Sequence, residues 1–398
     1  MVAPRDNEDV HQILADAAAS GTPLEVVGRG SKRRLGRPMQ TAASLDLSGL
    51  AGITLYEPEE LVMTARAGTP LAEIDQALAE RSQRLAFEPM DMGPLYGEPE
   101  NSASIGGVFA ANLSGSGRLR HGAARDHLLG FKAVNGRGEF FKSGSRVVKN
   151  VTGYDLSKVI CGSYGTLAAM TEVTFKVLPA PDKTRTVLIF GLDDMRAAEA
   201  MSAALGSPHE VVAAAHLPAS IAARSSVSYV SGAGRGVTAV RVEGPTPSAE
   251  HRCRALREEL ARFGETEELH GMNSAKLWRE VRDARFFVGD PRPLWRLSLA
   301  PTDGPKAISR IVRALQGEWF YDWGGGLVWL AIPISSDAGA HIIRGAIEGG
   351  HATLVRADAA VRAAVPVFQP QPGPLAALTR RVKESFDPKG VLNPGRMG

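Results

Sequence analysis

Residues 104–122 read SIGGVFAANLSGSGRLRHG and contain five glycines in nineteen positions. This glycine density disfavours a regular helix or strand, while the apolar start of the stretch is unlike a free linker. Glycine lets the backbone approach another group closely because it carries no Cβ atom. The stretch therefore predicts either a loop that lies against a flat ligand or a glycine-lined turn.

Two further glycine-rich segments lie on either side of this stretch. Upstream, residues 24–27 (LEVV) predict a short strand that runs into Gly28-Arg29-Gly30-Ser31. Downstream, residues 151–156 (VTGYDL) and 161–167 (CGSYGTL) have the same character. A glycine loop after a strand can bind a pyrophosphate, because its backbone N–H groups converge on the phosphate oxygens. Three such segments together favour a shared ligand over three unrelated turns.

The best-known nucleotide motifs do not fit these segments. The Rossmann fingerprint needs a third glycine where this chain has Arg33, and Arg34 and Pro38 disfavour the helix that should follow. The spacing of a Walker A motif is absent, which disfavours a P-loop NTPase. A tight turn at residues 28–30 is equally compatible with the residues. Lys32 and Arg33 nevertheless supply cations suited to a diphosphate.

Composition excludes several classes of protein. The 398 residues are 44% hydrophobic and carry a formal net charge of +3, which excludes intrinsic disorder and favours two domains. The short basic run at residues 31–34 is a poor basis for nucleic-acid binding. Only Cys161 and Cys253 are present, so the chain cannot supply the thiolates of an iron–sulfur cluster or a structural zinc site.

The N-terminal residues and the apolar segments bear on localisation. The first residues, MVAPRDNEDVHQ, are acidic where a secretory signal is basic, and residues 324–334 form an apolar stretch too short to cross a bilayer. We therefore expect a cytoplasmic protein with no membrane span of its own, which reaches the inner membrane only through a partner.

Prolines divide the chain into parts. Residues 177–181 (VLPAP) end a first domain that holds a helix at 69–82, with Thr69 as its N-cap and Pro70 at its first position. Strands are then predicted at 187–190, 237–242, 294–299, 327–332 and 351–355, and helices at 193–205, 248–263, 307–315 and 338–347. This alternation indicates antiparallel sheets covered on one face by helices, in an order that the sequence leaves open. We expect domains at 1–180 and 181–365, and a returning segment at 366–398 with a helix at 375–386.

The glycine segments, taken in order, resemble those of the FAD-binding flavoproteins of the vanillyl-alcohol oxidase and p-cresol methylhydroxylase (PCMH) type. The resemblance rests on residues 26–32, 104–107 with 111–112, 153–156, 162–167 and 393–395. Within that superfamily, residues 87–138 and 146–179 are similar to the FAD-binding E subunits of glycolate oxidase (glycolate dehydrogenase). The resemblance implies an α+β fold of two domains, with a PCMH-type FAD-binding domain and a ferredoxin-like α+β cap domain.

The resemblance also assigns cofactor-binding residues. It places Gly28, Arg29, Gly30, Ser31 and Lys32 around the FAD pyrophosphate, and Ser104, Ile105, Gly106 and Gly107 along the diphosphate and ribityl chain. It places Gly162, Gly165, Thr166 and Leu167 at the adenine and ribose, Asn393 at the flavin, and Asn112, Gly153 and Asp155 in the same site. Valine at Gly106 is expected to block the cofactor. No His, Tyr or Cys stands out as an attachment point, so we predict noncovalent FAD.

Catalytic residues are harder to assign than cofactor residues. Oxidising a 2-hydroxy acid needs a base and a cation for the carboxylate. Related dehydrogenases carry metal-binding histidines in a His-x-Gly-Asp-Gly-Asn-x-His segment of the cap, and residues 322–329 (DWGGGLVW) of this chain lack both. We therefore assign no metal and no catalytic residue. Arg282 and Arg285 are candidates for holding a substrate carboxylate, or else form the polar face of a helix.

The resemblance implies a role within a complex. The chain is expected to be the FAD-binding subunit of a glycolate-oxidising complex, which converts glycolate to glyoxylate. It would hold or pass electrons beside a catalytic sister FAD subunit and an iron–sulfur subunit. Two alternatives stay open: a stand-alone FAD-dependent 2-hydroxy-acid dehydrogenase, and a non-catalytic scaffold that contains FAD.

Overall fold

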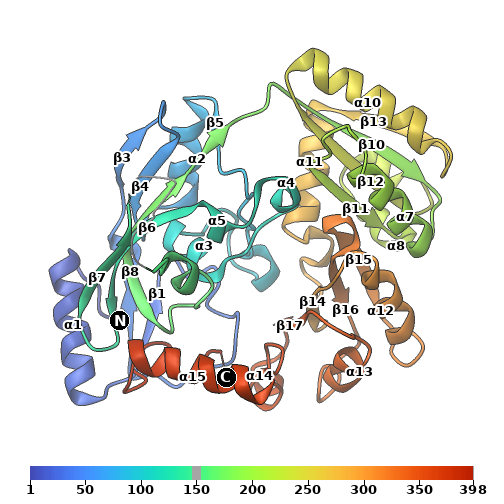
Figure 1. Ribbon diagram of the computed structural model, residues 1–398. Helices are drawn as coiled ribbons and strands as arrows, with labels where there is room; N and C mark the ends of the chain where they lie inside the picture. The colour runs from blue at the N-terminus through green and yellow to red at the C-terminus, as the bar shows by residue number, and fades with distance from the viewer. Residues whose placement is uncertain (146–153, 398) are drawn as a thin grey trace. The chain divides into compact units, whose positions relative to one another are not determined.

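The computed structural model describes residues 1–145 and 154–397. The chain forms two compact units, which we describe separately (Figure 1). The first unit contains Met1–Ser114, Gly122–Ala180 and Pro370–Gly398. The second contains Pro181–Gln369 together with Gly115–His121, a segment that the sequence had placed in the first domain.

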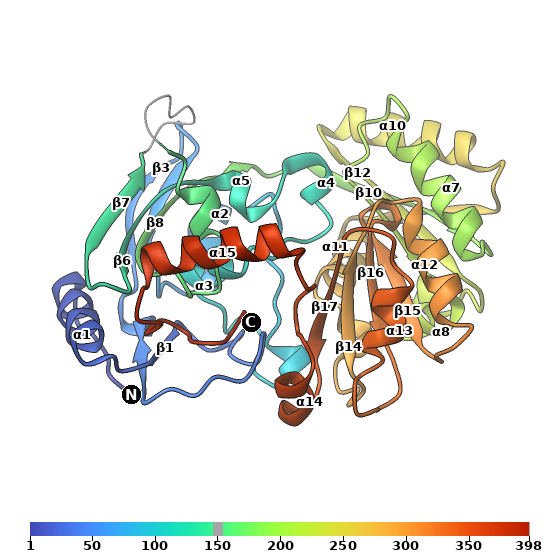
Figure 2. The ribbon, with the colours of Figure 1, turned by 60° about the horizontal axis from the view of Figure 1, so that its bottom comes forward.

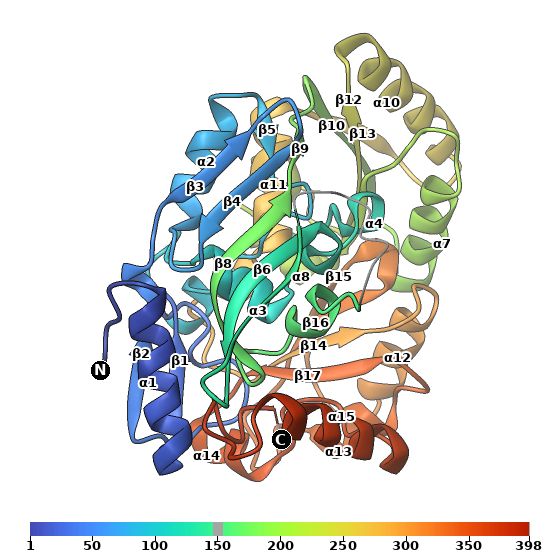
Figure 3. The same cartoon turned by 60° about the vertical axis from the view of Figure 1, so that its left-hand side comes forward.

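The first unit is built around an antiparallel sheet of five strands in the order β3-β4-β8-β6-β7 (Figure 3). A short parallel pair, β1-β2, and an antiparallel pair, β5-β9, lie beside it. The strands are β1 (Leu24–Val27), β2 (Ala43–Asp46), β3 (Ile53–Glu57), β4 (Val62–Arg66), β5 (Gln83–Arg84), β6 (Leu128–Asn135), β7 (Phe140–Gly144), β8 (Ala168–Lys176) and β9 (Leu178–Pro179). Strand β1 has the predicted bounds, because its apolar residues end at Gly28.

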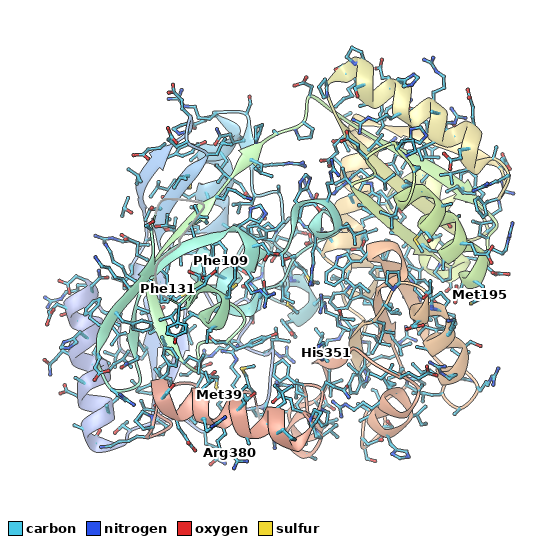
Figure 4. All side chains as sticks on the ribbon, in the orientation of Figure 1. Met39, Phe109, Phe131, Met195, His351 and Arg380 are labelled. Atoms are coloured by element: carbon cyan, nitrogen blue, oxygen red, sulfur yellow. The ribbon has the colours of Figure 1, made fainter. Side chains whose placement is uncertain are left out.

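Helices cover both faces of this sheet. Val134 and Ala169 pack with the buried side of α1, whereas their neighbours Ala133 and Ala168 pack with α2 and α3. This follows from the alternation of side chains along a strand. Phe109 and Phe131 belong to the second of these cores (Figure 4). The helices are α1 (Asn7–Ser20), α2 (Leu71–Ala79), α3 (Ile105–Ala111), α5 (Ala124–His127), α6 (Ser157–Ile160) and α15 (Gly373–Phe386), with 3-10 turns at Leu47–Gly49 and Pro94–Tyr96.

The second unit has one antiparallel sheet of eight strands, in the order β13-β10-β12-β11-β15-β16-β14-β17. The strands are β10 (Lys183–Phe190), β11 (Ala213–Leu217), β12 (Val237–Gly244), β13 (Thr266–His270), β14 (Leu294–Ser298), β15 (Glu318–Asp322), β16 (Leu327–Ala331) and β17 (His351–Arg356). The helices are α4 (Arg118–His121), α7 (Asp194–Leu205), α8 (Ala219–Ala222), α9 (Ser228–Ser231), α10 (Thr246–Leu260), α11 (Gly271–Arg282), α12 (Asp303–Ile311), α13 (Ala340–Gly345) and α14 (Ala359–Ala364), with 3-10 turns at Arg285–Phe287 and Trp323–Gly325.

This unit repeats one motif twice. The series β10-α7-β11-β12-α10-β13 and β14-α12-β15-β16-α13-β17 both follow the ferredoxin-like order β-α-β-β-α-β. Their strands have matching spatial orders, and the two halves join where β11 pairs with β15 through His216 and Tyr321. No repeat is visible in the sequence, because the two halves share topology and not residues.

The prediction that helices cover one face of this sheet is only half right. Ala197 of α7, Cys253 of α10, Ile308 of α12 and Ile343 of α13 share one apolar core with Val187 and Ile189. On the opposite face, Thr186 is 2.7 Å from the Ser274 hydroxyl and accepts a hydrogen bond from Trp278 Nε1 at 2.8 Å. Helix α11, which carries Ser274 and Trp278, therefore covers the other face of β10.

Three predictions of local structure are wrong. Residues 104–122 contain helices α3 and α4, because Gly106 packs closely against Ala67 and this tertiary contact outweighs the low helix propensity of glycine. Thr69 does not cap α2; its hydroxyl donates to Arg66 O at 2.6 Å, and the helix begins at Leu71 after Pro70. Helix α12 begins at Asp303, before the predicted start at residue 307.

Asp193 provides a test of how the second unit is stabilised. It is the N-cap of α7, and its carboxylate accepts a hydrogen bond from the Arg196 N–H at 2.9 Å. We expect Asp193→Ala to lower the free energy of unfolding by about 1 kcal/mol, because one N–H at the helix start loses its partner. Urea unfolding measures the change, and Glu258→Ala, at an exposed position on α10, is the control. Equal effects of the two variants would contradict the capping role.

Candidate functional site

The three glycine segments meet at one pocket in the first unit. It encloses about 730 Å³ of space, a volume that includes its open mouth. Its walls come from residues 25–33 at the end of β1, from Ser104 and residues of α3, from Tyr164 and Gly165, and from Arg396 near the C-terminus. Segments far apart in the sequence thus share one cavity.

The loop after β1 offers a row of backbone donors. Within the described residues, the N–H groups of Gly28 to Lys32 have no acceptor, whereas the next N–H, that of Arg33, donates to Gly30 O at 2.9 Å. Gly30 has a φ of +84°, which a side chain would strain. Consecutive free N–H groups form a binding site for anionic oxygens.

Two buried cations stand beside this loop. Lys32 is 8% exposed and Arg396 is 7% exposed. In the part of the chain that the structure describes, no carboxylate pairs with Lys32, whose Nζ lies 3.4 Å from Ser31 Oγ. The pKa of Lys32 is lowered to about 8: burial is the main cause, Asp91 raises the pKa in part, and Arg396 contributes a smaller lowering. Burial also lowers the pKa of Arg396. Two buried positive charges favour an anionic ligand, and a diphosphate fits both charge and donors.

Arg33, the other cation predicted for the ligand, also lines the pocket but is paired with an acid. Its guanidinium pairs with the buried Glu25, with Nε 2.8 Å from Glu25 Oε1. The Ser44 hydroxyl also donates to Glu25 at 3.1 Å. This pair ties the loop to strands β1 and β2 and offsets the charge of Arg33, whereas no carboxylate of the described residues pairs with Lys32.

The predicted cofactor residues divide into two groups. Nine line the pocket: Gly28, Arg29, Gly30, Ser31, Lys32, Ser104, Gly106, Gly107 and Gly165. The others in the described residues do not line it: Ile105, Asn112, Asp155, Gly162, Thr166, Leu167 and Asn393. Gly153 lies outside the described residues.

Most residues of the second group support the walls of the pocket. The Ile105 and Leu167 side chains are buried in the apolar core, and the Thr166 hydroxyl donates to Ser163 O at 2.7 Å. Asn112 ends α3 with a φ of +51°, and its side chain accepts a hydrogen bond from the Arg125 N–H. Asp155 is exposed. The other four side chains hold the backbone around the site through the core and these hydrogen bonds.

The resemblance places Asn393 at the flavin. In the structure its side chain connects two walls of the pocket. Its Oδ1 accepts a hydrogen bond from the Val26 N–H at 2.7 Å, and its Nδ2 donates to Tyr164 O at 2.8 Å. Tyr164, which lines the pocket, has a φ of +55°, uncommon for a residue other than glycine. The amide therefore holds β1 and the turn at Tyr164 together.

The candidate substrate residues lie in the second unit and are engaged with an acid. Arg282 donates to the buried Asp283 through Nε at 2.7 Å and Nη2 at 2.8 Å, and Arg285 Nε lies 3.6 Å from the same carboxylate. In the cap segment, Asp322 accepts hydrogen bonds from Ser116 Oγ and the Trp323 N–H, both at 2.7 Å. Among the described residues, no cluster of three or more His, Cys, Asp or Glu is suited to a metal ion.

Sequence reasoning missed Arg396 and Tyr164. Tyr164 stands within the third glycine segment, where its position between Gly162 and Gly165 was the available signal. Arg396 follows the Asn393-Pro394-Gly395 motif, but nothing local shows that it reaches a loop more than 360 residues upstream, bonding Lys32 O at 2.6 Å.

Comparisons with known proteins agree with this site. Residues 1–144 match the family model described as FAD binding domain. The chain is 37% identical to glycolate oxidase subunit GlcE of Escherichia coli, over 98% of this chain and 95% of that protein. It is 29% identical to glycolate oxidase subunit GlcD of Bacillus subtilis, over 56% of this chain and 44% of that protein. The solved structure of p-cresol methylhydroxylase is similar in fold, with a TM-score of 0.70 at 13% identity, covering 100% of this chain and 88% of that one.

The fold and the site define an FAD-dependent oxidoreductase with a PCMH-type FAD-binding domain and an α+β cap. Its cofactor is FAD, and the unpaired N–H groups and buried cations of the pocket suit the diphosphate of that cofactor. The chain belongs to the GlcE family of glycolate oxidase subunits. No helix among the described residues combines the length and the apolar character needed to cross a membrane.

Proposed function

We propose that this chain is the FAD-binding subunit of a multisubunit complex that oxidises glycolate to glyoxylate. The observation that carries the proposal is the pocket of unpaired N–H groups and buried cations, in a chain 37% identical to GlcE over nearly its full length. FAD supplies a two-electron acceptor when it is bound. Two electrons and two protons leave glycolate as it becomes glyoxylate, which matches that capacity.

The residues of this chain would hold the cofactor without a covalent bond. The N–H groups of Gly28 to Lys32 and the ammonium of Lys32 would bind the diphosphate, and Gly107 and Gly165 would let backbone lie against the cofactor. Among the described residues, neither His nor Cys lines the pocket, and Tyr164 is the one Tyr that does. Burial raises the pKa of both the Cys161 and the Cys253 thiol to about 12, which keeps them unreactive.

We also infer the partners of the chain from its chemistry. Two buried cysteines cannot hold an iron–sulfur cluster, so electrons that reach this FAD would leave to another protein, and an iron–sulfur subunit is the proposed acceptor. Arg282 and Arg285 are engaged by Asp283, which favours glycolate oxidation in a sister flavoprotein like the GlcD relative. The complex would then be peripheral at the inner membrane.

The visible spectrum of the purified chain tests this function. We expect a bound flavin spectrum that anaerobic glycolate leaves unchanged in the isolated chain and bleaches once the sister and iron–sulfur subunits are added. Heat or acid should release the FAD from the protein, because no covalent bond holds it. Bleaching of the isolated chain by glycolate would favour the stand-alone dehydrogenase. A flavin that never changes redox state in the assembled complex would favour the scaffold.

A further inference from the structure

The C-terminal segment at residues 391–397, which we call the tail, runs beside β1 (Figure 2), and its Arg396 lines the cofactor pocket. The Leu24 N–H donates to Val391 O at 2.7 Å, and the Asn393 N–H donates to Leu24 O at 3.0 Å. The tail thus extends the β1-β2 pair, and Leu392 forms a parallel bridge with Leu24. It ends beside the loop that follows β1.

The Arg396 side chain is hydrogen-bonded to that loop. Its Nη2 donates to Lys32 O at 2.6 Å and its Nε donates to Leu35 O at 3.2 Å. The Arg37 N–H in turn donates to Arg396 O at 3.0 Å. Gly36 leaves room for this side chain, because a Cβ there would stand 2.9 Å from Arg396 Cγ. One planar guanidinium therefore holds two carbonyls of the loop whose N–H groups face no protein acceptor.

This arrangement links the tail to the cofactor. Fixing the carbonyls of Lys32 and Leu35 also fixes the peptide groups of the loop, and preorganised donors bind an anion without an ordering cost at the time of binding. The charge of Arg396 is buried next to that of Lys32, and the two charges repel each other. An anion in the pocket offsets this repulsion and so stabilises the docked tail. By linkage, the anion must favour the docked tail to the same extent.

We propose that Arg396 is a positioning residue that sets the affinity for FAD, by latching the tail onto the diphosphate-binding loop. The inference rests on the FAD site of the proposed function. It adds that the last residues of the chain, and not only the glycine segments, determine retention of the cofactor.

Three variants of the full chain test the latch. Arg396→Met keeps the length of the side chain and loses both hydrogen bonds, so we expect the dissociation constant for FAD to rise about 5- to 20-fold. Arg396→Lys keeps the charge but cannot hold two carbonyls at once. Its affinity for FAD should therefore lie between that of the unchanged chain and that of Arg396→Met. Arg380→Met, at an exposed position on α15 (Figure 4), is the control and should bind FAD like the unchanged protein. Flavin fluorescence quenching measures binding, and circular dichroism checks the fold.

A second readout separates positioning from simple destabilisation. FAD should protect the tail of the unchanged chain from carboxypeptidase, and this protection should be lost in Arg396→Met at a concentration of FAD that still saturates the pocket. An unchanged dissociation constant in a folded Arg396→Met variant would overturn the latch while leaving FAD binding intact. Failure of the unchanged chain to bind FAD would instead overturn the proposed function. Loss of fold in Arg396→Met leaves Arg396→Lys and the protection assay to decide.

Discussion

Replacing Lys32 with methionine is expected to weaken FAD binding about 10- to 150-fold and, at the same time, to stabilise the FAD-free protein. The ammonium is 8% exposed and no carboxylate of the described residues pairs with it, so its burial costs free energy until an anion arrives. A hydrogen bond to a charged group contributes about 1.5–3 kcal/mol, which gives the expected loss of affinity. Methionine fills a similar volume without the charge.

The charge of Lys32 also predicts how FAD affinity and the stability of the FAD-free protein change with pH. In the FAD-free protein the pKa of Lys32 is about 8, with burial as the main cause and with Arg396 lowering it and Asp91 raising it. A bound diphosphate favours the ammonium and raises this pKa, so binding above pH 8 requires uptake of a proton. FAD affinity should therefore be constant below about pH 8 and fall by up to about tenfold per pH unit above it. The stability of the FAD-free protein changes oppositely, rising between pH 8 and the ordinary pKa of lysine, because the unfolded chain binds the extra proton there.

Fluorescence titration with FAD from pH 6 to pH 10, in the unchanged chain and in Lys32→Met, measures both effects. The variant should show weak binding with a flattened pH profile and a higher urea midpoint without FAD. Lys142→Met, at an exposed position on β7, should match the unchanged chain. Parallel pH profiles in the unchanged chain and Lys32→Met would refute the assignment. If Arg396 lowers the pKa of Lys32 as its position indicates, Arg396→Met should move the fall in affinity to higher pH.

Sequence reasoning located the pocket where local signals were strong. Strand β1 could be predicted to the residue because LEVV contains two β-branched valines and a leucine and is followed directly by Gly28. Nine of the predicted cofactor residues reach the pocket because glycine marks close approaches that a resemblance of motifs can reveal. The roles of single side chains were less accessible: Ile105 stands between two pocket-facing positions, yet it is fully buried in the core.

The features that the sequence did not reveal depend on distant contacts. Strand β11 reads AAAHL and has little β propensity, but it is buried between β12 and β15. Helix α11 begins at Gly271 and is held by Trp278 and Ser274 against Thr186. Arg396 acts across more than 360 residues of sequence. In each case contacts between residues far apart in the sequence determine the local structure. The periodicity of a single sequence does not reveal such contacts.

Two single substitutions by valine, at the adjacent glycines Gly106 and Gly107 of α3, are expected to have different effects. One should lower the stability of the protein, and the other should lower its affinity for FAD. The sequence predicts that valine at Gly106 blocks the cofactor. From the structure we expect valine to clash with FAD at Gly107, and with the protein itself at Gly106. A Cβ at Gly106 would stand 2.7 Å from Ala67 Cβ and 2.8 Å from Ala67 O, whereas a Cβ at Gly107 would meet only Ser104 Oγ, at 3.3 Å. Both glycines border the pocket, but the space at Gly106 is taken by the backbone after β4.

Gly106→Val should therefore destabilise the first unit by about 1–3 kcal/mol or more, because Ala67 is held by its own backbone hydrogen bonds and cannot move aside. FAD would be lost as a consequence of partial unfolding, and saturating FAD should recover part of the binding. Gly107→Val should leave stability unchanged or slightly higher, since valine has a better helix propensity than glycine. Its side chain would occupy space at the pocket wall, so FAD retention should fall about 100-fold or more, which corresponds to displacing the cofactor from a contact worth about 3 kcal/mol.

Flavin content per purified chain and urea unfolding of the FAD-free protein distinguish the two variants. The expected pattern is a low urea midpoint with FAD-dependent recovery for Gly106→Val, and a normal midpoint with no recovery for Gly107→Val. Because the two positions are neighbours on one short helix, general effects of valine on α3 are shared and cancel in the comparison. A Gly107→Val protein that retains full flavin would show that the cofactor does not lie against this turn of α3. The diphosphate would then be held by the loop after β1 alone, with Lys32 as its charged partner and with Arg396 positioning the loop.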